Sequence, residues 1–314
     1  MATSFVFGLR APRPAVVWGS SPQLTAALAA LAVATVRRRP FILEVRDVWP
    51  HILLEAGMIT EAAATYRALK VLERLLYRNA DAIVILAQGS ATYITDEGVA
   101  SDKLVFVPNG ADPDDFKVKE SRASLRREFG FDQLTVVYAG AHGPANGLNL
   151  VLDAAEKLQS EMEVTFVLVG NGAIKRSLQA DAARRGLMNI KFFDPIPKAE
   201  IPRIYAACDI GLHCLADMEL FKSAVSPNKL YDYMAAGLPV ITNTSGEVAS
   251  IVEHAGAGVA VANGDIASGV RSLASRAPEE LATLGDAGIA WMKINRSPAA
   301  MAERIEELLN KVSR

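Results

Sequence analysis

The chain has 314 residues, 51% of them hydrophobic and 22% charged, so it can bury one large core or two ordinary ones. A formal net charge of −2, a pI of about 6.1 and the lack of a long basic run disfavour nucleic acid as a partner. Two cysteines, Cys208 and Cys214, lack the spacing of a metal site or a disulfide framework. A reducing compartment is therefore favoured.

The N-terminal part contains the longest apolar run, Leu24–Val36, which is shorter than the roughly 18–20 residues of a membrane-spanning helix. We expect a buried helix, with the basic run Arg37–Arg39 complementing its C-terminal dipole. Contact of these arginines with a membrane is the alternative. Because Met1–Leu9 lacks the pattern of an export signal, we expect a cytoplasmic protein, with peripheral contact at the inner face of the membrane left open.

Short β-branched apolar runs alternate with helical patterns along the chain. The expected strands are Ala15–Trp18, Phe41–Val45, Ala82–Leu86, Leu104–Val107, Leu134–Tyr138, Val164–Val169, Ile190–Phe193, Asp209–Leu212, Pro239–Thr242 and Gly258–Val261. Helical periods lie between them, at Gly147–Leu158, Ala173–Arg185, Ile201–Ala207 and Lys229–Ala236. This alternation predicts the α/β class, with two Rossmann-like, doubly wound parallel-sheet domains.

A composition break at Pro108–Asp115, rich in turn formers and acids, marks the expected interdomain linker. No calcium-type loop surrounds these acids, so they are interpreted as a solvated turn. We expect a partial N-terminal domain at 1–115, a C-terminal domain at 116–296, and a C-terminal helix at 297–314 that packs back on the first. With four strands before the linker and six after it, the N-terminal domain is expected to be incomplete.

Two glycine turns follow expected strands of the second domain. Tyr138–Gly147 includes Gly140, His142, Gly143 and Gly147, and the second turn includes Gly170 and Gly172. Glycines let the backbone approach an anion and direct helix N-terminal amides at it, and strand C-termini are where such folds bind ligands. A purely structural role is the alternative. The four histidines are scattered without ligand spacing, so no metal site is expected.

The most informative segment is Ser226–Val240, in which Pro227 and Gly237 bracket a short helix that leads into a strand. A lysine and an aspartate in its first turns, Lys229 and Asp232, suit a phosphate and a sugar hydroxyl respectively. A capped helix with surface charges is the alternative.

This segment resembles the P-x-K-L-x-[DE]-Y-M-A-A-G-x-P-V-I signature of GT-B glycosyltransferases of family 4, the bacterial surface-polysaccharide type. Similar motifs occur in the family's order at Gly19–Pro22, Glu44–Pro50, Pro108–Asp112, Tyr138–Gly147, Gly170–Gly172 and Gly246–Glu247. The resemblance extends over essentially the whole chain from about residue 14.

For the donor, the resemblance implies that Asp232 contacts the ribose hydroxyls of a nucleotide. The amides of Asn228, Lys229 and Leu230 would hold the diphosphate, with the Lys229 ammonium beside it. The glycine turns would cradle the donor phosphates, and Glu247 would lie near the donor. UDP-sugars are favoured, with no cofactor.

For the acceptor side, the resemblance assigns Arg46 and Asp47 to the segment that faces the acceptor, with Asp47 positioning its hydroxyl. The chain departs from the family pattern at Ala224, where many members have a carboxylate eight residues before Asp232. It also has Ala141 and Asn146 where many members have cations. Lys229 and helix amides would therefore carry more of the diphosphate charge.

The implied reaction is transfer of a hexosyl or N-acetylhexosaminyl group, retaining and metal-independent, to a hydroxyl of a glycan or lipid-linked glycan in cell-envelope polysaccharide biosynthesis. Because the N-terminal half is short, the chain is interpreted as a fragment, a misplaced start, or a variant whose sheet is completed by a partner chain or a second copy. The rival is a non-catalytic nucleotide-sugar-binding subunit. An epimerase of the same fold is disfavoured, because Glu44–Pro50 resembles the transferase pattern.

Overall fold

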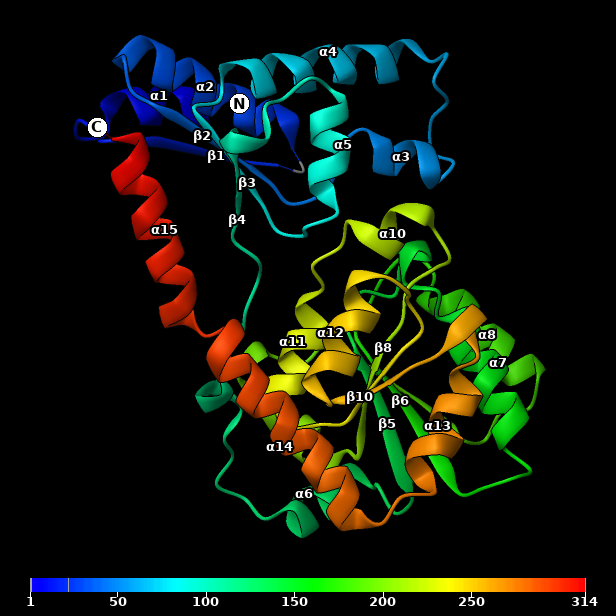
Figure 1. Cartoon of the computed structure of the whole chain (residues 1–314). Coiled ribbons are helices and arrows are strands. Elements are labelled where there is room, and N and C mark those ends of the chain that lie inside the picture. The colour runs from blue at the N-terminus through cyan, green and yellow to red at the C-terminus, as the bar shows by residue number, and fades with distance from the viewer. Residues whose placement is uncertain (1, 22, 314) are drawn as a thin grey trace. The chain divides into compact units, whose positions relative to one another are not determined.

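The computed structural model describes residues 2–21 and 23–313. The chain forms two compact units (Figure 1). Unit 1 comprises Met1–Asn109, Met218–Ser226 and Ala299–Arg314, and unit 2 comprises Gly110–Asp217 and Pro227–Pro298. Each unit contains one parallel sheet, which confirms the predicted fold class.

All ten expected strands are present, each within two residues of its expected bounds. Unit 1 contains β1 (Val17–Ser20), β2 (Phe41–Val45), β3 (Ala82–Ile85) and β4 (Leu104–Phe106). Unit 2 contains β5 (Leu134–Ala139), β6 (Val164–Val169), β7 (Ile190–Phe193), β8 (Ile210–His213), β9 (Val240–Thr242) and β10 (Gly258–Ala260).

The helices alternate with these strands, as the helical periods indicate. In the first part of the chain they are α1 (Ala2–Arg10), α2 (Leu24–Arg37), α3 (His51–Glu55), α4 (Ala64–Asn79) and α5 (Ser90–Asp96). They continue with α6 (Arg122–Phe129), α7 (Asn149–Leu158), α8 (Lys175–Arg184), α9 (Ile201–Ala207), α10 (Glu219–Ser223), α11 (Asn228–Ala235), α12 (Glu247–Ala255), α13 (Ile266–Ala274), α14 (Pro278–Asn295) and α15 (Pro298–Val312).

The sheet of unit 1 has the sequential order β1-β2-β3-β4, and its strands bury side chains on both faces. On one face Phe41, Leu43 and Ile83 pack in a core cluster with residues of α2 and α4. On the other, Ile42 and Val84 pack with residues of α15. The alternation follows the period of two of a strand and explains why these runs are apolar at nearly every position.

The sheet of unit 2 has the order β10-β9-β8-β5-β6-β7. Strands β6 and β7 are added on one side of β5, and β8, β9 and β10 on the other, so the strand order reverses between β5 and β8. Helices α7, α8 and α13 supply buried side chains to the core on one face. Helix α11 contacts β8 and β9, and Gly211 of β8 lies against the ring of Tyr233. Ligands of such sheets bind outside the strand C-termini at the point of reversal.

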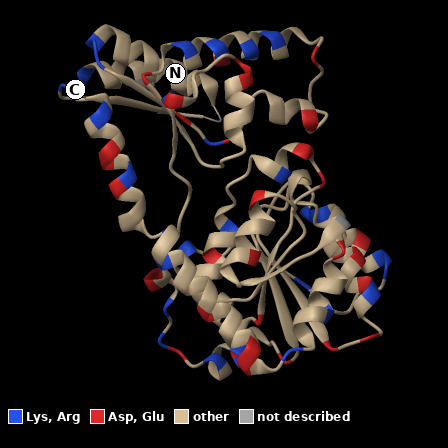
Figure 2. Cartoon of the chain, in the orientation of Figure 1, with Lys and Arg blue, Asp and Glu red and all other residues tan. Residues whose placement is uncertain are grey.

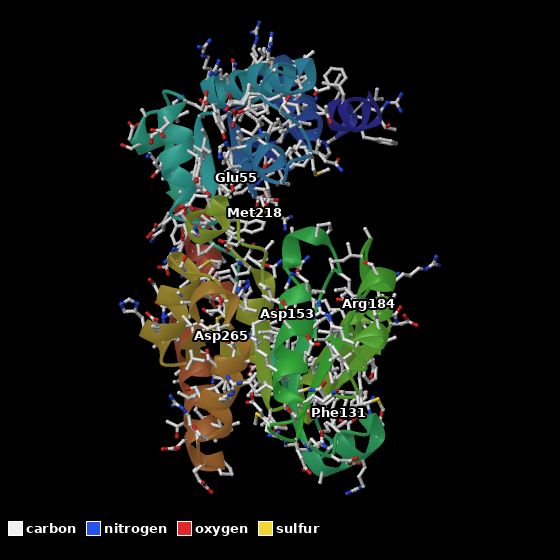
Figure 3. All side chains as sticks on the ribbon, turned by 90° about the vertical axis from the view of Figure 1, so that its right-hand side faces the viewer. Glu55, Phe131, Asp153, Arg184, Met218 and Asp265 are labelled. Atoms are coloured by element: carbon white, nitrogen blue, oxygen red, sulfur yellow. The ribbon has the colours of Figure 1, made fainter. Side chains whose placement is uncertain are left out.

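The unit boundary lies between Asn109 and Gly110, six residues before the end of the expected first domain. The segment Met218–Ser226, which precedes α11 in the chain, belongs to unit 1. Its Leu220 amide donates to Glu55 at 2.9 Å, and Glu55 lies beside the Met218 end of the segment (Figure 3). Asn109 holds the other end, donating from its side-chain amide to the Ser226 carbonyl at 3.0 Å.

Candidate functional site

A cavity of about 940 Å³ opens in unit 2 at the C-terminal ends of β5, β6 and β7. Its wall includes Gly140 after β5, Gly170 after β6, and Asp232 of α11. The loop after β7, α9 and the segment that follows the unit boundary complete the lining with Pro195, Ile196, Lys198, Tyr205, Asp112, Asp115 and Phe116, among others. The sheet topology therefore brings together residues that the sequence placed in three separate motifs.

Helix α11 begins beside the first glycine turn. Lys229, in its first turn, donates from Nζ to Asn146 Oδ1 at 3.2 Å and lies 5.1 Å from the Tyr138 ring centroid. A side chain at Gly140 would meet Lys229 Cδ at 2.9 Å. Burial lowers the pKa of Lys229, and Asp232 opposes this shift. The ammonium, the Gly140 backbone and the orphan amides of α11 form a surface suited to an anion.

Asp232 lies one turn further along α11, in the cavity wall. Burial raises the pKa of its carboxyl to about 6, against the opposing charges of Lys198 and Lys229. The carboxylate is thus ionised at neutral pH and close to titration under mildly acidic conditions. A half-buried carboxylate in a cavity wall is a good acceptor for ligand hydroxyl groups.

The two glycine turns pack directly on each other. The Gly140 amide donates to the Val169 carbonyl at 2.9 Å, and the His142 amide donates to the Asn171 carbonyl at 2.9 Å. Gly170 has φ +141°, and a side chain there would collide with the Gly140 carbonyl. Gly172 faces the His142 carbonyl in the same way. The glycines of the second turn therefore permit close packing, while Gly140 and Gly170 also form the cavity wall.

His142 lies behind this wall. Its side chain is fully buried, and both ring nitrogens lack a hydrogen-bond partner among the described residues. Burial, aided by the nearby charge of Lys175, lowers the pKa of the imidazole, so the ring is neutral at pH 7. It packs near Tyr138 and Phe192, with centroid distances of 6.1 and 6.4 Å. The structure thus places His142 outside the cavity lining, and its role at the donor site stays a prediction.

The remaining residues expected at the donor site lie outside the cavity lining. Gly147 has φ +59° and ends the first turn against the Leu215 carbonyl, whereas Gly143 has only the Asn146 side chain nearby. Asn228 and Leu230 present their backbone at the start of α11, with the Leu230 side chain in the core. Glu247 is the first residue of α12.

Lys175, which the sequence did not single out, fastens two loops of the cavity. Its side chain is buried, and Nζ donates to the Gly170 carbonyl at 2.8 Å, the Phe193 carbonyl at 2.9 Å and Asp194 Oδ1 at 2.7 Å. It therefore satisfies carbonyls at the ends of both β6 and β7. Gly170 lines the cavity directly, and the 194–198 loop continues into the lining residues Pro195, Ile196 and Lys198.

Lys198 and Tyr205 were also missed. Lys198 lines the cavity, and its charge opposes the rise that burial causes in the pKa of the Asp232 carboxyl. It therefore supplies a cation that the first glycine turn lacks. Tyr205 stacks on Phe116 with a centroid distance of 6.0 Å, and both rings line the cavity. Lys198 could have been found from its position in the sequence, because it follows the C-terminal end of the expected strand Ile190–Phe193.

Arg46 and Asp47 lie in unit 1, directly after β2. The Arg46 amide donates to Ser21 Oγ at 3.1 Å, and its side chain is exposed. Burial raises the pKa of Asp47, with Arg46 opposing the shift. Within the same unit, Glu44 accepts a bond from Ser20 at the end of β1. Polar side chains thus gather at the C-terminal edge of this sheet too.

Within residues 2–21 and 23–313, no group of three or more His, Cys, Asp and Glu side chains could hold a metal ion. Within the same residues, no helix combines the length and apolar character needed to cross a membrane.

Comparison with known proteins supports the architecture. The family model for the glycosyl transferase 4-like domain matches residues 2–110, and that for glycosyl transferases group 1 matches residues 133–277. The probable glycosyltransferase WbjE of Pseudomonas aeruginosa is 27% identical over 222 residues, which cover 69% of this chain and 55% of WbjE. The putative colanic acid biosynthesis glycosyl transferase WcaI of Escherichia coli is 26% identical, with 75% of this chain and 60% of WcaI covered. The chain thus spans little more than half the length of these curated relatives.

Solved structures show the same fold. The Anabaena protein Alr3699/HepE, solved in complex with UDP-glucose, has a TM-score of 0.80 at 20% identity, with 99% of this chain and 81% of that chain covered. WaaG, a glycosyltransferase involved in lipopolysaccharide biosynthesis, has a TM-score of 0.71 at 16% identity, covering 95% and 85% of the two chains.

Two parallel-sheet α/β domains, with a cavity at the point of reversal in the second, define a GT-B protein. The matches to both family models and to the curated relatives make the assignment more specific. The chain belongs to family 4 of the GT-B glycosyltransferases.

Proposed function

We propose that the chain transfers a glycosyl group from a nucleoside diphosphate-sugar, with UDP-sugars favoured, to a hydroxyl of a glycan or lipid-linked glycan. The observation that carries this proposal is the cavity of unit 2, which joins Gly140, Gly170 and Asp232 at the point where the sheet order reverses. Its volume of about 940 Å³ suits a ligand of nucleotide-sugar size.

The donor would be held by three kinds of contact. The Asp232 carboxylate would accept bonds from ribose hydroxyls, and the amides at the start of α11 would donate to the diphosphate. Lys229 would approach the same phosphates from beside the Gly140 turn. HepE was solved with UDP-glucose and with UDP, which supports a uridine nucleotide as the first donor to test.

The transfer step would depend on charge stabilisation. Cleavage of the bond between the anomeric carbon and the diphosphate oxygen leaves negative charge on the departing nucleotide. Lys229, Lys198 and the positive end of α11 would stabilise that charge where it develops. We assign Asp47 of unit 1 to orienting the acceptor hydroxyl, with Arg46 beside it. The family resemblance supports retention of the anomeric configuration without an obligatory metal.

Turnover of labelled UDP-sugars in the presence of bacterial lipid-linked glycan extracts tests this proposal. We expect labelled glycan to form together with UDP. Asp47→Asn should lower turnover by roughly a hundredfold while leaving donor affinity unchanged, because it removes a charge from the acceptor side only. Anomeric analysis of the product tests retention, and the same reaction in EDTA tests independence from metal.

The alternative is a nucleotide-sugar-binding subunit without catalysis. Ala224 favours it, since the position where relatives carry a carboxylate contributes only a methyl group, buried with Val48 and Leu220. Donor binding without turnover across all acceptor extracts would support this alternative. Ala224→Glu then serves as a gain-of-function test, since it restores the family pattern.

A further inference from the structure

The α10 segment, Met218–Ser226, packs in unit 1 although its neighbours on both sides in the chain belong to unit 2. Its contacts come from Glu55 of α3, from Gly89 directly before α5 and from Asn109 after β4. The elements that carry these residues follow β2, β3 and β4, and parallel strands end at the same edge of a sheet. The α10 segment therefore lies along the C-terminal edge of the unit 1 sheet, where Arg46–Asp47 also lies.

Two contacts fix the position of the α10 segment closely. The half-buried carboxylate of Glu55 accepts a bond from the Leu220 amide at 2.9 Å, and its other oxygen lies 3.2 Å from His51 Nε2. The Leu220 amide belongs to the first turn of α10, where a helix offers no acceptor of its own. Gly89 supplies a tight fit, because a side chain there would collide with the Ser223 carbonyl.

Attraction between unlike charges does not explain this docking. Figure 2 shows acidic residues on both α3 and α10, and these are Glu55 and Glu219. Glu219 pairs with Lys222 of its own helix at 2.7 Å. The bond to the Leu220 amide and apolar packing therefore hold α10 in unit 1.

The apolar packing of the α10 segment involves the residue next to Asp47. Val48 is 3% exposed and lies in a cluster with Leu220 and Ala224, which partly buried side chains of α3 and α5 adjoin. The other two buried members of this cluster both come from the α10 segment, so the segment covers much of Val48. The Val48 carbonyl also accepts a bond from the Ile52 amide at 3.0 Å. Its side chain and backbone are thus both fixed.

We propose that the α10 segment positions Asp47 for the transfer step and that Glu55 keeps the segment in place. This role depends on the proposed function, in which Asp47 orients the acceptor hydroxyl. Because Asp47 directly precedes Val48, a shift of Val48 moves the carboxylate, and a misplacement of about 1 Å can lower a reaction rate about a hundredfold. Glu55 is therefore a positioning residue, which acts through Leu220 and Val48.

Steady-state transfer by the full chain, together with calorimetric titration with UDP, tests the proposal. Glu55→Ala removes the acceptor of the Leu220 amide. Gly89→Ala adds a methyl group that displaces the Ser223 carbonyl without backbone strain, since Gly89 has φ −64°. Each should lower kcat by about tenfold and leave UDP affinity within about twofold, because no residue of the cavity changes. Glu55→Gln keeps an acceptor oxygen and should retain kcat within about threefold of the parent chain. The matched control, Glu61→Ala, changes an exposed glutamate of the same unit and should behave as the parent does.

A double-mutant cycle separates positioning from a general loss of packing. If Glu55 acts through Asp47, Glu55→Ala should lower kcat by no more than about twofold in a chain that already carries Asp47→Asn. A loss of about tenfold in that background too would overturn the proposal, because independent effects on kcat multiply. Unchanged kcat in Glu55→Ala and Gly89→Ala would also overturn it.

Hydrogen exchange over residues 46–52 provides a readout that needs no transfer activity. Amides in this stretch donate to the carbonyls of Asp47 and Val48 at 2.9 and 3.0 Å. In both unit 1 variants, exchange should rise by about fivefold or more over residues 218–226 and 46–52, and in the control it should not. A rise confined to residues 218–226 would contradict the positioning role. A parent chain without transfer activity would contradict the proposed function, and exchange would still decide whether the α10 segment fixes Asp47. Thermal melting establishes that each variant is folded.

Discussion

The two units are both parallel sheets, but only unit 2 reverses its strand order. Its strands proceed outward from β5 in one direction to β7 and then from β8 in the other to β10. The four described strands of unit 1 add in sequence along one direction. Reversal separates the loops after β5 and β8, and the cavity lies beside this point, at the ends of β5, β6 and β7 with Asp232 of α11 in its wall.

The difference separates two kinds of support for function. In unit 2, the strand order, the cavity and a set of polar groups all indicate a ligand site at the C-terminal ends of the strands. In unit 1, Arg46 and Asp47 lie at the corresponding strand end, but their roles rest on the family resemblance. Substitutions of single residues in unit 2 test whether this agreement identifies a ligand site, because these residues differ in burial, charge and backbone conformation.

Lys229 should give the largest effect on ligand binding. Lys229→Met keeps the length of the side chain and removes its charge, which should weaken nucleoside diphosphate binding by up to about a hundredfold, as expected for a bond to a charged group. Calorimetric titration measures this. Lys191→Met, which changes an exposed lysine of β7, is the matched control and should bind as the parent does. Equal affinity of Lys229→Met and Lys191→Met would show that phosphate is held elsewhere.

Gly147 and Gly143 lie in the same turn but differ in conformation. Gly147→Ala forces a side chain into φ +59° and to 2.7 Å from the Leu215 carbonyl, which should cost about 2 kcal/mol or more of unfolding free energy. Gly143 has φ −109°, and its nearest neighbour would lie at 3.6 Å, so Gly143→Ala should stay within about 0.5 kcal/mol. Urea unfolding of both variants measures the difference. An equal decrease in the free energy of unfolding of both variants would contradict the packing described for this turn.

Lys175 tests whether loop anchoring matters for binding. Lys175→Met removes the side-chain donor from the Gly170 and Phe193 carbonyls, of which Phe193 keeps the bond from the Gly170 amide, and should cost about 1–3 kcal/mol of stability. Nucleotide affinity should fall about tenfold, because the cavity wall loses its anchor. Arg176→Met, at the next and exposed position, should change neither quantity. Reduced stability with unchanged affinity would assign Lys175 a role in folding alone.

The smallest effect is the pH dependence set by Asp232. Its raised pKa predicts that affinity for a nucleoside diphosphate-sugar falls several-fold as the pH drops below about 6, where the carboxyl takes up a proton. The same shift acts on stability in the opposite sense. The pKa of Asp232 in the folded chain lies above the ordinary value of 3.8, so protonation of this carboxyl favours the folded state. This contribution to the free energy of unfolding is complete below pH 3.8 and is lost as the pH rises through about 6.

Asp232→Asn should therefore flatten the affinity profile and raise the melting temperature at pH 7 relative to the parent. Titrations with an intact nucleotide-sugar avoid the second phosphate ionisation of a free diphosphate. An affinity profile that stays pH-dependent in Asp232→Asn would place the titrating group elsewhere.

The strands were predictable because buried parallel strands are continuous apolar runs with clear ends. The first was misplaced by two residues, since its pairing extends through Gly19 and Ser20, which lie opposite Leu43 and Glu44. The motifs around Gly140, Gly170 and Asp232 were found because each combines a strand end with a distinctive residue. Their meeting in one cavity depended on strand order, which the local sequence does not encode.

Other features depended on contacts between distant parts of the chain. Glu55 and Leu220 are 165 residues apart, and nothing around Met218–Ser226 indicates that it packs in unit 1. Lys198 lies in a proline-rich loop without a recognisable motif. His142 was singled out because it lies within a glycine turn, but its ring is buried in the core behind that turn.

Calorimetric titration of the full chain with UDP and a panel of UDP-sugars, compared with Asp232→Ala, tests the central claim that the cavity of unit 2 is the donor site. We expect saturable binding to the parent chain and an affinity lower by about tenfold or more in the folded variant. Binding of equal strength to the two proteins, or none to a folded parent chain with any nucleoside diphosphate, would contradict it.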